Sequence, residues 1–101
     1  MRRPDCDGRA ITIVASAVDP TQYAAEVSGK LAEYTGSAYL KTSETCPSLR
    51  ARMPDGSDIY VVYFGPYPDA STACAARAAG PPDAYVKMLS FDLPFDHDVP
   101  C

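Results

Sequence analysis

The chain has 101 residues, of which 47% are hydrophobic and 22% charged, and its formal net charge is −4 at pH 7. A chain of this size and composition is typical of one small folded domain with a thin core, and not of a disordered segment. The acidic balance argues against nucleic acid as a partner, because phosphate backbones are bound by concentrated lysine and arginine. No apolar run approaches the roughly 18–20 residues that span a bilayer, so we expect no membrane insertion in this segment.

The predicted elements begin with a strand at residues 9–18, whose β-branched and apolar side chains occupy both faces. Such a strand is typical of the centre of a sheet. Asp19 and Pro20 then favour the start of an amphipathic helix that ends at Gly36. Residues 37–42 form a short strand, and a loop rich in turn residues follows.

The second half begins with residues 59–64, the strongest strand pattern of the chain, which stops before Gly65 and Pro66. Asp69 can cap a second helix over residues 70–79, and a last strand follows at residues 84–89. The remaining residues show no usable periodicity. We therefore divide the chain into an N-terminal arm (1–8), a domain (9–89) and a C-terminal tail (90–101) tied down mainly by its final cysteine.

The two halves repeat, because residues 37–41 (SAYLK) close the first half as residues 83–87 (DAYVK) close the second. The order of elements predicts an α+β fold of the βαββαβ, split-βαβ type, also called ferredoxin-like or RNP-like. Its four-stranded antiparallel sheet has the order 4-1-3-2, with both helices on one face. The opposite face is then open to solvent.

Four cysteines, Cys6, Cys46, Cys74 and Cys101, form an even set in a short chain that has no Cys-x-x-Cys pair. Two disulfides are the favoured interpretation, and free buried thiols of a cytosolic protein are the alternative. Of the three possible pairings, the topology favours Cys6 with Cys101 and Cys46 with Cys74. Disulfides indicate an extracytoplasmic protein (secreted, periplasmic or at the cell surface), either without its targeting segment or cut from a longer chain.

Two lysines predict which side chains lie on the open face. Lys41 and Lys87 would be costly to bury unpaired beneath the helices, so we expect both to point away from them. Strand alternation then places Tyr39 and Tyr85 on the same open face.

The central strands complete this predicted surface. Val61 and Tyr63 point outward if their neighbours point inward, and Ile13, with Ile11 and Ala15, joins them if Thr12 and Val14 face the helices. The predicted ligand-binding residues are therefore Ile13, Tyr39, Lys41, Val61, Tyr63, Tyr85 and Lys87. Such a surface is a shallow aromatic platform for a flat ligand. The alternative is that the tail or the 43–58 loop folds over this face and buries it.

Several of these segments resemble the SPOR domain, the sporulation-related repeat of bacterial envelope proteins. Residues 60–67 (YVVYFGPY), Ala73 and residues 84–87 (AYVK) match the pattern of its second half, in which a strand ends Gly-Pro-Phe before an Ala-containing helix and a closing strand. In the first half, residues 15–17 stand where the family has Gly-Ser-Phe, and Ala24 follows at a matching distance. The resemblance covers residues 9–89.

This resemblance implies a module that binds peptidoglycan glycan strands on its sheet face. It assigns that role to Ile13, Val61 and Tyr63, with Tyr39 and Tyr85 on either side. Ile13 stands where the family has a polar residue, and Val61 where it frequently has a basic one. An extracytoplasmic interaction or sensor domain, which binds another envelope protein with the same surface, is the alternative.

Catalytic chemistry finds little support in the sequence. His97 is the single histidine, so we expect neither a metal site nor a cofactor. Acylphosphatases share the predicted topology, but residues 15–20 (ASAVDP) lack the glycines and arginine of a phosphate-binding loop. We therefore expect a binding module and not an enzyme.

Overall fold

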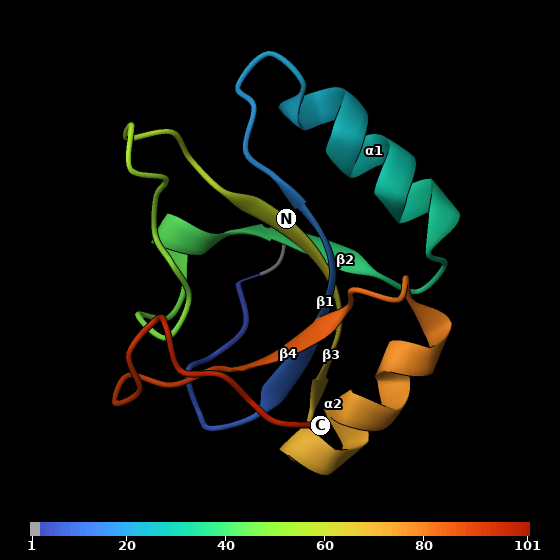
Figure 1. The fold of residues 1–101 in the computed structure, drawn as a ribbon, viewed down its shortest axis with the longest axis vertical. Coiled ribbons are helices and arrows are strands. Elements are labelled where there is room, and N and C mark those ends of the chain that lie inside the picture. Colours follow the sequence, from blue (N-terminus) through green and yellow to red (C-terminus); the bar gives the residue numbers. More distant parts are fainter. Residues whose placement is uncertain (1–2) are drawn as a thin grey trace.

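In the computed structural model, which describes residues 3–101, four strands form one antiparallel sheet and two helices pack on one of its faces (Figure 1). The elements are β1 (Ala10–Ala17), α1 (Tyr23–Glu33), β2 (Ala38–Lys41), β3 (Tyr60–Tyr67), α2 (Ala70–Ala76) and β4 (Tyr85–Met88), with single 3-10 turns at Thr42–Glu44 and Arg77–Ala79. The strand order is β2-β3-β1-β4. The predicted βαββαβ fold and strand order are therefore confirmed.

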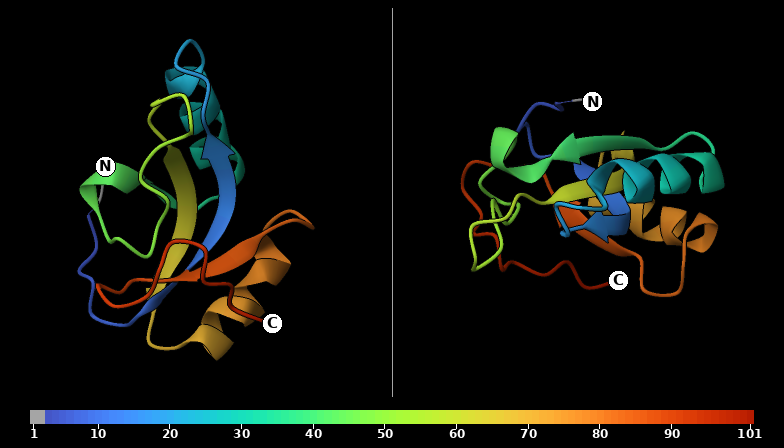
Figure 2. Two further views of the ribbon diagram at one scale, coloured as in Figure 1. Left: turned by 60° about the vertical axis from the view of Figure 1, so that its left-hand side comes forward. Right: turned by 90° about the horizontal axis from the view of Figure 1, so that it is seen from above.

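Both helices lie on one side of the sheet, while the β2–β3 loop, residues 3–8 and the first part of the tail lie on the other side (Figure 1; Figure 2). On the helix side, Val27 of α1 packs in one cluster with Val14 and Val62 of the sheet, and Ala73 of α2 packs in another with Val86. Both clusters are built from small and β-branched side chains, which suits the alanine-rich α2. This layer is the core that the helical pattern predicts.

A second core lies on the face that the sequence analysis left open. Its buried members come from the strands and from the β2–β3 loop: Ile11, Ile13, Leu40, Cys46, Leu49, Ile59, Val61, Tyr63 and Leu89. The loop thus covers the sheet as a third layer. Removal of both sheet faces from water explains why β1 is apolar along both of its faces.

β1 is not a regular strand, because its register with β3 shifts between Ile13 and Ala15. Val14 is the extra residue, and both Val14 and Ala15 consequently pack on the helix side. The prediction that Ala15 shares the open face with Ile13 is therefore wrong. A second irregularity, at Gly65 and Pro66, lets β3 continue to Tyr67, beyond the predicted end of the strand.

The two helices start differently. Asp69 caps α2 as predicted, with its carboxylate accepting a hydrogen bond from the Thr72 backbone N–H at 2.8 Å. Asp19 does not cap α1, which begins at Tyr23. Its carboxylate instead accepts a hydrogen bond from the backbone N–H of Thr21 at 3.0 Å and closes a turn ahead of the helix.

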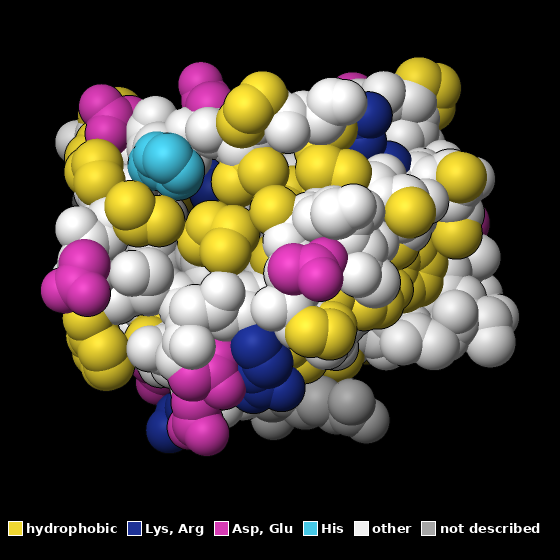
Figure 3. All heavy atoms as spheres, turned by 90° about the horizontal axis from the view of Figure 1, so that it is seen from below, with side chains coloured by type: hydrophobic (Ala, Val, Ile, Leu, Met, Phe, Trp, Pro, Cys, Tyr) yellow, Lys and Arg dark blue, Asp and Glu magenta, His cyan; other side chains and the backbone are white. Residues whose placement is uncertain are grey.

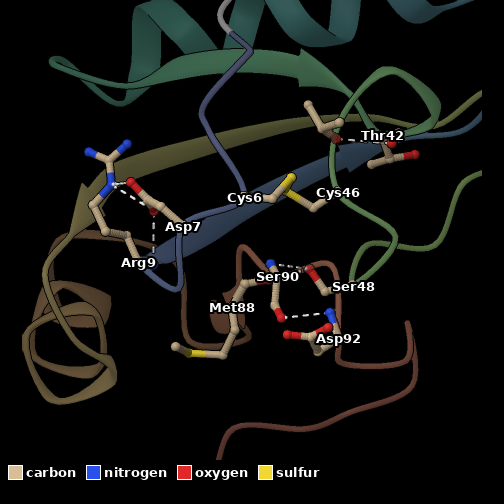
Figure 4. Close-up of a disulfide and its surroundings, with 10 residues drawn as sticks. Cys6, Asp7, Arg9, Thr42, Cys46, Ser48, Met88, Ser90 and Asp92 are labelled. Carbon is tan, nitrogen blue, oxygen red and sulfur yellow. Dashed lines mark hydrogen bonds and ion pairs between the residues drawn. A yellow bond between two sulfur atoms is a disulfide. The ribbon is translucent and has the colours of Figure 1, made fainter.

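All four cysteines are paired, but as Cys6–Cys46 and Cys74–Cys101. The predicted pairing of Cys6 with Cys101 and of Cys46 with Cys74 is wrong. The reason is the third layer: the β2–β3 loop doubles back over the sheet and brings Cys46 to the arm (Figure 4). The tail meanwhile returns past β4 to α2, where Val99 packs beside Ala73.

Candidate ligand-binding site

Three of the predicted ligand-binding residues, Ile13, Val61 and Tyr63, lie on the predicted face, away from the helices. Their exposed fractions are only 2%, 2% and 1%. The β2–β3 loop covers them with Cys46 and Leu49 among others, so the expectation that they form an open platform is wrong. The covering loop was the alternative that the sequence left open.

Tyr39 and Lys41 lie on the other face, together with the helices. The register decides this, because Tyr39 pairs with Val62, and Val62 packs under α1. Lys41 forms an ion pair with Asp58, and the two charged groups lie 3.2 Å apart. This carboxylate raises the pKa of Lys41 through a hydrogen bond and its charge. The prediction that both side chains point away from the helices is therefore wrong.

Tyr85 and Lys87, on β4, remain on the predicted face and border a cleft. The cleft has a volume of about 430 Å³ and lies between the sheet, the β2–β3 loop and the tail. Its lining comprises Ile13, Ser16, Val18, Thr42, Leu49, Arg50, Met53, Ile59, Val61, Tyr85, Lys87, Phe95, Asp96 and Asp98. The buried ones among these, such as Ile13 and Val61, form its apolar floor.

The loop side of the cleft is held to the end of β4 by Ser48. Its hydroxyl donates a hydrogen bond to the Met88 carbonyl at 2.6 Å and accepts one from the Ser90 backbone N–H at 3.0 Å (Figure 4). Ser48 is itself buried, so both bonds are protected from water. The position of the loop over the sheet is thus fixed at Ser48 as well as at the Cys6–Cys46 disulfide.

The tail forms the other wall of the cleft. Lys87 Nζ donates hydrogen bonds to the backbone carbonyls of Phe95 and His97, at 2.7 and 3.0 Å. The Arg50 guanidinium lies over the Phe95 ring, 5.8 Å from its centroid. These contacts join the tail to both β4 and the loop, so the tail is held by more than its final cysteine.

The rim of the cleft combines exposed rings with charged groups. Tyr85 and Phe95 are 44% and 49% exposed, and the charged residues Arg50, Asp96 and Asp98 also line the cleft. Figure 3, a view from below, shows hydrophobic side chains at the surface with acidic groups between them. Within residues 3–101 no group of three or more His, Cys, Asp or Glu side chains is placed to hold a metal ion. The arrangement suits reversible binding of a ligand with both apolar and hydroxyl-rich surfaces.

Sequence reasoning missed the residues that the loop and the tail contribute to the cleft, above all Arg50, Phe95 and Asp98. They come from aperiodic segments, so strand alternation gives no information on where they lie. One signal was present: residues 94–98 (PFDHD) place an aromatic residue beside two carboxylates in a tail that a cysteine holds to the domain.

Comparisons of this chain with known proteins found no matching family model, curated protein or solved structure. None of the helices within residues 3–101 has the length and apolar character required to cross a bilayer. Two disulfides in a small domain are typical of oxidising, extracytoplasmic compartments. The cleft and this redox setting are the observations on which a functional proposal can be built.

Proposed function

We propose that this chain is a non-catalytic, extracytoplasmic binding module whose ligand is a glycan strand of peptidoglycan. The observation that carries the proposal is the Tyr85 ring, 44% exposed at the rim of a cleft that also presents Arg50, Asp96 and Asp98. An exposed aromatic ring at the mouth of a cleft, together with groups that donate and accept hydrogen bonds, is an arrangement that ligand-binding sites use to orient a ligand.

The chemistry of a sugar fits this rim. A pyranose ring presents a face of C–H groups, which packs on an aromatic ring, and an equatorial belt of hydroxyls. Carboxylates accept hydrogen bonds from such hydroxyls and guanidinium groups donate to them, so Asp96, Asp98 and Arg50 can bind the belt while Tyr85 binds the face.

The resemblance to SPOR domains supports peptidoglycan as the source of the glycan. The site proposed here differs from the one that the resemblance implies. The resemblance places Ile13 and Val61 at the centre of the binding surface, but in this chain both residues are buried. Of the two flanking tyrosines only Tyr85 borders the cleft. The binding surface therefore moves from the centre of the sheet to the β4 side.

A sedimentation assay with purified sacculi tests the proposal. Sacculi are used as isolated and after amidase treatment, which removes the stem peptides. We expect the protein to be retained by both preparations, and more strongly by the treated one. Tyr85→Ala should weaken retention roughly tenfold, the equivalent of about 1.4 kcal/mol. Phe91→Ala is the matched control, since Phe91 is 72% exposed but does not line the cleft.

Failure of both sacculus preparations to retain the protein would overturn the glycan proposal. The apolar floor of the cleft, with Leu49, Met53 and Ile59, then favours the second candidate, an envelope protein that inserts a peptide segment. Equal losses for Tyr85→Ala and Phe91→Ala would show that glycan binding occurs outside the cleft.

A further inference from the structure

The two disulfides lie in different surroundings. Cys46 is 1% exposed and belongs to the core of the third layer, and Cys6 packs against the same cluster. Cys101 is exposed, and its partner Cys74 on α2 is only partly buried. An external reagent can therefore reach Cys74–Cys101 in the folded protein, whereas access to Cys6–Cys46 requires the core of the third layer to open.

A hollow of about 480 Å³ lies beside Cys74. Its lining comes from the end of α2 and the turn that follows, and Arg77 is the one charged side chain among the lining residues. A guanidinium group beside a cysteine favours the thiolate over the thiol, and a stabilised thiolate leaves more readily in thiol–disulfide exchange. The hollow thus combines access for a second molecule with a charge that assists cleavage of the bond at Cys74.

Apart from this disulfide, non-covalent contacts hold the end of the tail. The tail passes β4, ends beside α2 and forms neither helix nor strand over residues 90–101 (Figure 1; Figure 2). Lys87 donates hydrogen bonds to the carbonyls of Phe95 and His97, and Val99 packs beside Ala73. A terminal segment with so few contacts stays ordered mainly while it is tied down. Opening of the disulfide should therefore free it.

We propose that Cys74–Cys101 is a thiol–disulfide exchange site for an external dithiol, and that its opening releases the tail from the cleft bordered by Tyr85 (the Tyr85 cleft). A thiolate of the dithiol attacks Cys101 Sγ, the S–S bond breaks, and Cys74 Sγ leaves with the electron pair and takes up a proton. The second thiol of the dithiol loses its proton and attacks the dithiol sulfur of the mixed disulfide, so that Cys101 leaves and is protonated. The dithiol is oxidised to a disulfide, and the same two electrons reduce Cys74–Cys101 to two thiols.

Graded reduction without denaturant tests the exchange site. The protein is incubated at neutral pH with dithiothreitol, samples are quenched with N-ethylmaleimide, and the labelled cysteines are identified by peptide mass spectrometry. We expect Cys74 and Cys101 to be labelled at least roughly tenfold faster than Cys6 and Cys46. The fast phase should be absent from Cys74→Ala/Cys101→Ala. Equal rates for the two pairs, or faster labelling of Cys6 and Cys46, would overturn the proposal.

The contribution of Arg77 is measured in the same assay. Arg77→Gln should slow the reduction of Cys74–Cys101 roughly threefold, because the departing thiolate loses its neighbouring charge. Lys30→Gln removes one positive charge from α1, away from the hollow, and is the matched control. An equal effect of the two substitutions would contradict the assignment of this role to Arg77.

Release of the tail is measured separately, by heteronuclear NOEs of the backbone amides. In Cys74→Ala/Cys101→Ala the NOEs of Phe95, His97 and Val99 should fall below those of the unmodified protein, while that of Leu49 in the β2–β3 loop stays the same. A tail that keeps its NOEs in this variant would contradict its release.

One consequence rests on the function proposed above. Because Phe95, Asp96 and Asp98 line the Tyr85 cleft, release of the tail should also lower retention by sacculi, roughly fivefold in Cys74→Ala/Cys101→Ala. If sacculi retain the unmodified protein and the variant equally, the tail does not control the cleft. If they retain neither, the glycan proposal fails, and the labelling rates and NOEs still decide whether the exchange site exists.

Discussion

Thr12 lies in the middle of β1 and is completely buried, facing α2. Its hydroxyl donates a hydrogen bond of 2.7 Å to the backbone carbonyl of Ala73. The bond joins the central strand to a helix of seven residues that is rich in alanine and has few large side chains to anchor it. This bond therefore adds to the packing of Ala73 beside Val86 in holding α2 on the sheet.

Replacement of this hydroxyl by a methyl group should destabilise the domain. Thr12→Val keeps the shape of the side chain but leaves the Ala73 carbonyl without its partner from β1, so we expect the free energy of unfolding to fall by about 1–3 kcal/mol. Urea denaturation followed by circular dichroism measures the change. Thr35→Val, at an exposed position, is the control and should stay within about 0.5 kcal/mol of the unmodified protein. Equal stability of the Thr12→Val protein would show that the bond contributes nothing net.

The two lysines show what residue-level reasoning can and cannot predict. The argument that a lysine avoids burial without a partner holds for both, yet it does not fix the face. Lys87 lies away from the helices and donates hydrogen bonds to tail carbonyls, while Lys41 lies on the helix face and forms an ion pair with Asp58. A long side chain near an edge can place its charge in water or against a partner from either face. The position of Asp58 depends on the loop, which carries no periodic signal.

At the scale of elements, Gly80 lies where the chain passes from the 3-10 turn after α2 towards β4. A Cβ atom at this position would lie 2.8 Å from Val14 Cγ1 and 3.3 Å from the Cβ of Ala84. Val14 is itself buried under α1 and cannot move away freely. The close approach of this turn to β1 thus requires a residue without a side chain.

We expect Gly80→Ala to lower the free energy of unfolding by about 1–3 kcal/mol, because the added methyl group overpacks the core against Val14. Gly29→Ala is the matched substitution in α1, where no atom outside the local helix backbone lies within 4 Å of the added Cβ. It should raise stability by about 0.5–1 kcal/mol through helix propensity alone. Thermal or urea unfolding measures both changes. Two changes of the same sign would contradict the assignment of Gly80 to a packing role.

The cap of α2 should make stability depend on pH. The backbone N–H of Thr72, and then its hydroxyl, bind the Asp69 carboxylate and lower its pKa. A carboxyl group with a lowered pKa in the folded state stabilises the fold above its unfolded pKa, near 3.9, and this contribution is lost as the pH falls through the folded pKa. Asp69→Asn keeps an acceptor at the cap but removes the titration.

Denaturant unfolding of both proteins from about pH 6 down to about pH 2 tests this linkage. The unmodified protein should lose more stability over the acidic part of this range than Asp69→Asn, so that the two curves converge at low pH. Asp7, Glu33 and Asp55 also have lowered pKa values, but they are present in both proteins and cancel in the comparison. Curves that stay parallel would show that the Asp69 charge does not stabilise the helix.

The sequence predicts the strands and helices better than it predicts on which face of the sheet the strand side chains lie. The order of strands and helices follows from apolar runs, Asp69 and the proline-glycine turns, and each predicted range overlaps the observed one. The face of β2 was predicted wrongly, because its apolar side chains, Ala38 and Leu40, pack in the core on the loop side and not beneath the helices. The bulge at Val14 could not be predicted, because β1 is apolar on both faces and shows no alternation that a bulge would interrupt.

For the whole molecule, the main unpredicted feature is the third layer. The β2–β3 loop, the arm and the tail cover the sheet face that the βαββαβ order alone leaves open. These segments are held by contacts between residues far apart in the chain, such as Ser48 with Met88 and Cys6 with Cys46. A single sequence gives no local signal for such pairs. The Tyr85 cleft exists only because these segments surround it.

The two disulfides should therefore anchor different segments: Cys6–Cys46 anchors the β2–β3 loop, and Cys74–Cys101 anchors the tail. Cys46 is 1% exposed and belongs to the core of the third layer, whereas Cys101 lies at the exposed end of the tail. We expect Cys6→Ala/Cys46→Ala and Cys74→Ala/Cys101→Ala each to lower the free energy of unfolding by roughly 2–4 kcal/mol, since each bridge restricts the unfolded chain. Loss of the first bridge should also loosen the loop and expose Ile13, Val61 and Tyr63.

Binding of the dye anilinonaphthalene sulfonate at neutral pH and without denaturant separates these two effects. Fluorescence should rise for the Cys6→Ala/Cys46→Ala protein, because its loosened loop exposes the apolar sheet face. It should stay near the unmodified level for Cys74→Ala/Cys101→Ala, whose loop remains held by Cys46 and Ser48. A rise in the second variant alone would show that the tail, and not the loop, keeps this face from water. No rise in either would show that packing holds the third layer without its disulfide.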